Sequence, residues 1–184
     1  MRRLQREVMD APKCYVEIGG KKIRKFPMEF EGMFLVSHMV NHVYEEGLGL
    51  RQVIDFAFWI NALKVRGEGL EVRWFDMELY QEYLRKMNMT RAARIFTCIC
   101  EKYLGVDRFI MGYAYTEKEE AFADKMVTDI MAVGNFAKDV KLEAGLQAYL
   151  WTTKRAISLG YLCPSEARWW PVSKLARFFW KKMK

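Results

Sequence analysis

Apolar residues recur at helical spacing along most of this 184-residue chain, and this periodicity constrains the fold more than any other feature. Residues 28–45 show it clearly, because Met33, Val36, Val40 and Val43 follow one another at intervals of three or four. Strands do not alternate with helices, as a parallel sheet would require. The chain is therefore predicted to be mainly α, a multi-helix bundle of about six or seven helices. The other helices are predicted at residues 50–65, 71–87, 89–104, 116–133 and 140–158, and a final basic, aromatic segment begins at Pro164.

Short local motifs mark the ends of several elements. Gly19-Gly20 separates the β-type runs "CYVEI" and "KKIRKF", and Pro27 closes the second run. Two glycines between such runs are typical of a two-residue hairpin turn. Thr116, with Glu119 three residues later, forms a capping box that predicts the start of a helix. One N-terminal β-hairpin is therefore expected ahead of the helices.

Basic charge is concentrated at the C-terminal end of the chain. Residues 151–184 hold eight Lys and Arg against the single acid Glu166, a net charge of +7, whereas the rest of the chain balances. We therefore expect three parts. They are a lead or remnant at 1–13, a hairpin plus helical domain at 14–163, and a basic, aromatic segment at 164–184.

The sequence indicates a cytoplasmic protein. No apolar run reaches the roughly 18 residues of a membrane helix, and no hydrophobic region follows the basic start as in a signal peptide. The cysteines show no spacing typical of a disulfide framework, so free and mostly buried thiols are predicted. These cysteines are Cys14, Cys98, Cys100 and Cys163.

The segment from His38 to Asp55 carries many ionisable groups between apolar runs. The helix from Val53 to Leu63 is apolar almost all round, which predicts burial. Asp55 lies within it, and a buried carboxylate without a partner is too costly to keep. Arg51 precedes it by one turn, in a first helical turn where a cation opposes the macrodipole by up to about 1 kcal/mol. We therefore expect Arg51 to have a fixed anionic partner.

Two interpretations of this corner follow, one structural and one functional. In the structural one, Arg51 and Asp55 form a polar network with one or both histidines and the neighbouring Glu45 and Glu46. Structural ion networks of this kind are common in proteins. The network would lock the helix–turn–helix corner.

In the functional interpretation, the corner receives a phosphate or another anion. Arg51 and Gln52 begin a helix after a glycine turn, and His38 or His42 would assist them. A third interpretation has His38 and His42 bind zinc, although Met39 stands where the metalloprotease motif has its glutamate. A dinucleotide site is excluded, because the glycines follow a helix and Gln52 occupies the third glycine position.

The stretch "FLVSHMVNHVYEEGLGLRQVIDFAFWI" resembles the central segment of an uncharacterised nucleotidyltransferase family of Bacteroides-type bacteria. The similarity continues through "RWFDMELYQEYLRKMNM", "YLGV" and "GNF", and it covers about residues 14–170. Its most specific part is "EGLGLRQ" followed by Asp55. The resemblance implies a polymerase-β-like nucleotidyltransferase domain followed by a helical region.

The chain departs from this family at the catalytic motif. The superfamily uses a Gly-Ser turn and a later Asp-x-Asp, whose acids hold two magnesium ions. Neither motif occurs in this sequence. The resemblance is therefore to the helical half, and we assign no catalytic residue and no metal ligand. Mg²⁺ is expected only if a separate nucleotidyltransferase domain supplies the acids, and that domain or a nucleotide is the expected partner.

The functional expectation is thus a helical accessory domain of a nucleotidyltransferase-like protein, with a nucleotide or phosphate contact at the corner from Gly47 to Arg51. The alternative is a non-catalytic protein-interaction module whose polar corner is structural. The tail, residues 164–184, has Pro171 at an expected helix start and basic residues opposite Leu175. It would dock on the domain, bind a membrane surface or contact nucleic acid.

Overall fold

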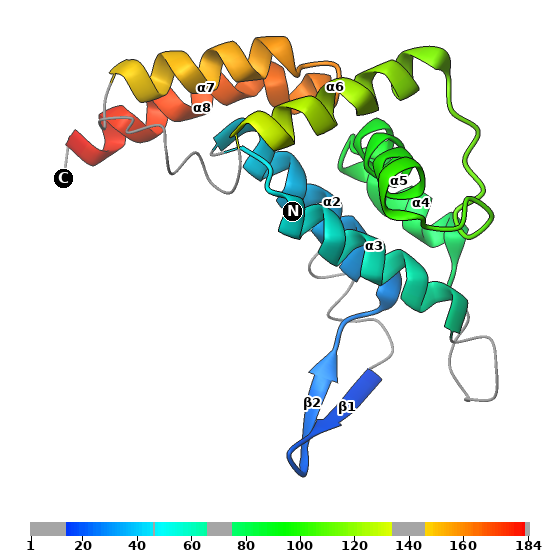
Figure 1. Cartoon of the computed structure of the whole chain (residues 1–184). Coiled ribbons are helices and arrows are strands. Elements are labelled where there is room, and N and C mark those ends of the chain that lie inside the picture. The colour runs from blue at the N-terminus through cyan, green and yellow to red at the C-terminus, as the bar shows by residue number, and fades with distance from the viewer. Residues whose placement is uncertain (1–13, 46, 66–74, 134–145, 183–184) are drawn as a thin grey trace.

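The computed structural model describes residues 14–45, 47–65, 75–133 and 146–182. Within these ranges it contains one antiparallel hairpin and seven helices, which confirms the mainly α fold with an N-terminal hairpin (Figure 1). The strands are β1 (Cys14–Ile18) and β2 (Lys21–Lys25). The helices are α2 (Met28–Glu45), α3 (Leu50–Val65), α4 (Met77–Lys86), α5 (Thr90–Leu104), α6 (Glu117–Val133), α7 (Leu146–Ser158) and α8 (Pro164–Lys182).

The hairpin turns at the predicted glycines. Gly19 and Gly20 have φ values of 58° and 75°, in the left-handed region that two-residue hairpin turns require. The register pairs Val16 with Ile23 and Ile18 with Lys21. Figure 1 shows the two strands projecting away from the helices, and their side chains are largely exposed.

Helix α2 lies at the centre of the bundle and contacts α3, α4, α5 and α7. Met33, Val36, Val40 and Val43, the residues that revealed the helical period, are all fully buried. Gly32 lets α3 approach closely, because a Cβ at this position would lie 2.2 Å from the Trp59 ring. The core is therefore organised around α2.

Helix α3 is buried on one face, and the prediction that it is buried all round is wrong. Val53, Phe56 and Ile60 are fully buried, but Phe58 is 70% exposed and Asp55 is also exposed. The physical reason is the position of α3: α2, α5 and the rings of Phe75 and Tyr80 pack on it, and part of its circumference stays open to solvent.

The start of α6 confirms the predicted capping box. The N–H of Glu119 donates to Oγ1 of Thr116 at 3.2 Å, and the N–H of Thr116 donates to Oε2 of Glu119 at 2.9 Å. This exchange satisfies two backbone donors at the helix N-terminus. The glutamate is thereby held close to the neighbouring helix α5.

Helices α7 and α8 run side by side and antiparallel (Figure 1). α8 begins at Pro164, so the expectation that it starts at Pro171 is wrong; Pro171 lies inside the helix. Trp170 is buried and its ring centroid lies 5.7 Å from that of Tyr44 in α2. The hydroxyl of Tyr44 donates to the carbonyl of Cys163 at 3.4 Å, which fixes the start of α8 on the bundle.

Two predictions about cysteines and membrane spans can be compared with the described part of the chain. Cys98, Cys100 and Cys163 are free and buried, as predicted. None of the helices in the described ranges combines the length and apolar character needed to cross a membrane.

Candidate functional site

The two histidines of the predicted corner lie next to each other on α2. Their Nε2 atoms are 3.1 Å apart, and their rings are arranged edge to face. Desolvation lowers the pKa of His38, and the adjacent His42 lowers it further. Among the described residues no group of three or more potential metal ligands forms, so no third ligand joins this pair.

The expected pairing of Asp55 with Arg51 is wrong. Both side chains are exposed on α3, and the described part of the structure contains no ion pair between them. Asp55 therefore keeps water as its partner and needs no cation. The premise of a buried carboxylate fails because α3 is covered on one face only.

The other residues of the corner have different surroundings. Glu45 pairs instead with Lys174 of α8, at 3.4 Å. Gln52 is buried, and its Oε1 has no hydrogen-bond partner among the described residues. Glu46 lies outside the described residues. An anion contact at Arg51, Gln52 and the histidines stays a prediction.

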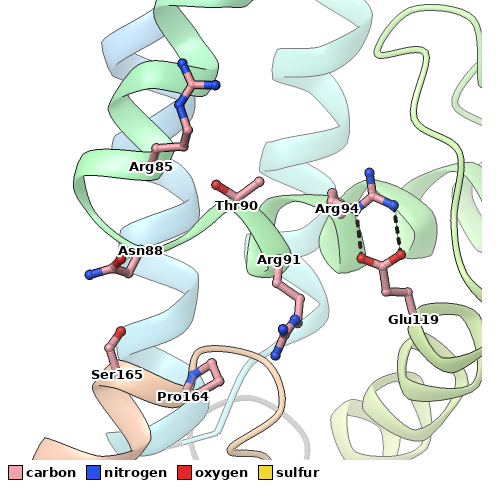
Figure 2. Close-up of a pocket in the computed structure, with 8 residues that line it drawn as sticks. All are labelled: Arg85, Asn88, Thr90, Arg91, Arg94, Glu119, Pro164 and Ser165. Atoms are coloured by element: carbon pink, nitrogen blue, oxygen red, sulfur yellow. Dashed lines mark hydrogen bonds and ion pairs between the residues drawn. The ribbon is translucent and has the colours of Figure 1, made fainter.

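A second candidate site lies where α4, α5, α6 and α8 meet. Figure 2 shows side chains from these elements around the start of α5. They surround a hollow of about 750 Å³, which we call the arginine pocket. Its lining residues are Arg85, Asn88, Thr90, Arg91, Arg94, Glu119, Pro164 and Ser165.

The arginine pocket carries more positive than negative charge. Arg94 is neutralised, because its Nε and Nη2 donate to the two carboxylate oxygens of Glu119 at 2.7 and 2.8 Å. These bonds, with a backbone bond from Thr116, hold the pKa of Glu119 at about 2. Arg85 and Arg91 are exposed, and among the described residues neither has an acidic partner. Two arginines without an acidic partner among the described residues therefore line this hollow.

Arg91 is held in place by neutral groups. Its Nη1 donates to the carbonyl of Tyr161 at 3.1 Å, and its guanidinium lies 4.5 Å from the centroid of the Tyr161 ring. A carbonyl and an aromatic face orient a guanidinium without cancelling its charge. Arg91 is thus positioned while its remaining donors stay available to an anion.

The start of α5 lies at the arginine pocket, because Thr90 and Arg91 of its first turn line the hollow. Met89 occupies the N-cap position and supplies no side-chain hydrogen bond, and the first turn contains no acidic residue. Arg91 lies in that turn, where a cation opposes the helix macrodipole. Helix N-termini with free N–H groups are anion sites, and arginines add charge-assisted hydrogen bonds to them. The geometry is therefore suited to bind a phosphate or a similar anion.

Part of this site could have been found in the sequence. The stretch "RKMNMTRAAR" places Arg85, Arg91 and Arg94 around a helix start without an acid. The reasoning about a cation in a first turn, applied to Arg51, holds equally for Arg91. Glu119 and Ser165 come from distant parts of the chain, and no local pattern connects them to this turn.

Comparisons of this chain with protein-family models, with curated proteins and with solved structures gave no match. The resemblance to a nucleotidyltransferase family therefore stays a prediction from the sequence.

Proposed function

We propose that this chain is a helical accessory domain of a nucleotidyltransferase-like protein and that it binds a phosphate-bearing ligand, such as a nucleotide, in the arginine pocket. The observation that carries the proposal is the pair of uncompensated arginines, Arg85 and Arg91, beside the uncapped start of α5. The resemblance of residues 14–170 supports the nucleotidyltransferase context. A cytoplasmic location belongs to the same proposal.

The contacts support binding rather than a chemical step. Arg85 and Arg91 supply guanidinium donors, Thr90 a hydroxyl, and the first turn of α5 its N–H groups. The carboxylate of Glu119 already accepts from Arg94 and Thr116, so it is occupied as an acceptor. In this role the domain would hold phosphates for a partner domain that supplies the metal-binding acids and Mg²⁺.

Arg51 offers a matched comparison within the same chain. It resembles Arg85 in being exposed on a helix, and the described residues provide neither side chain with an ion pair. Arg51, however, begins α3 without the further arginines that surround the start of α5. Separate substitutions of Arg85 and Arg51 therefore distinguish an anion site in the arginine pocket from one at the corner predicted from the sequence.

Isothermal titration calorimetry with pyrophosphate and with ATP, each with and without Mg²⁺, tests the proposal. We expect the wild type to bind and Arg85→Ala to lose about tenfold in affinity, because a hydrogen bond to a charged group contributes roughly 1.5–3 kcal/mol. Arg51→Ala should bind like the wild type. Absence of binding by the wild type would overturn the proposal. A loss confined to Arg51→Ala would move the anion site to the corner predicted from the sequence.

A further inference from the structure

Helix α8 presents a row of apolar side chains to solvent. Trp169, Val172 and Leu175 are 65%, 54% and 40% exposed, whereas the neighbouring Trp170 is 7% exposed and packs on Tyr44. Residues three apart lie on one side of a helix, so the three exposed residues form one stripe. We call it the α8 stripe. It lies on a different face of the helix from the docked Trp170.

The α8 stripe belongs to the most basic part of the sequence. Arg168 is exposed on the same side of the helix, and residues 151–184 carry a net charge of +7. Lys174 pairs with Glu45, and Arg155 with Asp129, but the sequence of this region still leaves an excess of basic residues. A stripe with an exposed tryptophan beside basic residues is the pattern of a helix that lies in a membrane interface.

The same face of α8 reaches the arginine pocket. Pro164 and Ser165 line the pocket, and on a helix Ser165 lies on the side of Arg168 and Val172. A flat anionic surface against the stripe would therefore place negative groups near the pocket as well. Phospholipid headgroups carry the phosphates that the pocket is suited to bind.

We infer that α8 docks on the surface of an anionic phospholipid bilayer, with the α8 stripe in the interfacial layer and the arginine pocket beside the headgroup phosphates. The part of the arginine pocket in bilayer binding rests on the proposed function, whereas the part of the α8 stripe is independent of it. A bilayer fits better than a protein groove, because it accepts a tryptophan in its interface and attracts basic residues without a specific acidic partner. The helix lies on the bilayer and does not cross it. This agrees with the described helices, none of which is long and apolar enough to span a membrane.

Co-sedimentation of the full chain with vesicles tests this inference. Vesicles of phosphatidylcholine alone are compared with vesicles that contain phosphatidylglycerol, at low and at high salt. We expect the wild type to pellet with the anionic vesicles and to be released by salt, because exposed charges are screened. The double variant Trp169→Ser/Val172→Ser should lose at least about tenfold in partitioning, since burial of apolar area drives insertion.

Exposed phenylalanines elsewhere provide the matched control. Phe58 and Phe109 are 70% and 83% exposed, so Phe58→Ser/Phe109→Ser removes comparable apolar surface away from α8. This control should pellet like the wild type. Equal pelleting of the stripe variant and the wild type, or no pelleting of the wild type, would overturn the inference.

The two proposals fail in different ways. Arg85→Ala, used in both assays, should weaken pyrophosphate binding and reduce vesicle binding less than the stripe variant does. Pyrophosphate binding without vesicle binding leaves the proposed function standing and overturns the inference. Stripe-dependent vesicle binding without pyrophosphate binding supports the docking of α8 and refutes the anion pocket.

Discussion

The ion pair between Arg94 and Glu119 gives a prediction that joins stability to ligand binding. Glu119 is 6% exposed and receives two bonds from Arg94 as well as the backbone bond of the capping box. Its pKa falls from 4.5 to about 2, with the bonds from Arg94 as the largest cause. At about 1.4 kcal/mol per pKa unit, the ionised form stabilises the fold by roughly 3 kcal/mol.

The sign of the pH dependence follows from the lowered pKa. The folded state binds the proton of Glu119 less tightly than the unfolded chain does, so the contribution is complete above pH 4.5. It declines as the pH falls and is lost near pH 2. Glu119→Gln preserves the shape and can still cap the helix through its amide oxygen, but it removes the charge. We expect this variant to lose roughly 3 kcal/mol of unfolding free energy at pH 7.

Urea denaturation followed by circular dichroism from pH 7 down to the acid limit of folding measures this effect. The difference in unfolding free energy between the wild type and Glu119→Gln should shrink steadily below pH 4.5. The variant also frees Arg94, so the arginine pocket gains a positive charge. Pyrophosphate should therefore bind more tightly to the less stable protein. A difference that does not change with pH would refute the assignment of this stability to the ionised Glu119.

Three further predictions concern packing and surface charge. Asp55→Ala should change the unfolding free energy by no more than about 0.5 kcal/mol, because this side chain is exposed; a loss of several kcal/mol in denaturation would restore the buried-pair interpretation. Gly32→Ala should cost about 1–3 kcal/mol, since its Cβ would lie 2.2 Å from the Trp59 ring, and an unchanged denaturation midpoint would contradict that contact. Arg155→Ala should cost about 3–5 kcal/mol, because it leaves the partly buried Asp129 without its partner. The double variant with Asp129→Ala should recover part of that loss, and no recovery would show that the pair is not the cause.

The helices were predictable from the sequence because their determinants are local. The apolar period of α2 and the capping box of Thr116 each lie within one element, and both appear in the structure as expected. The exposed side of α3 was not predictable in the same way. Asp55 and Phe58 belong to an almost continuous apolar run, and only the arrangement of the elements around α3 determines which side of the run is covered.

The electrostatic reasoning about buried carboxylates applies to this chain, but at another residue. A carboxylate withdrawn from water needs a cation, and Glu119 has one in Arg94, 25 positions away in the sequence. Asp55 was the candidate because its sequence neighbours are apolar, whereas Glu119 lies among charged neighbours in "EKEEAF" and gives no local sign of burial. Burial of a polar group depends on contacts between helices. A cation in a first helical turn can be recognised in the local sequence, and both Arg51 and Arg91 show it. Only the arrangement of α4, α5, α6 and α8 places Arg91, and not Arg51, in the arginine pocket.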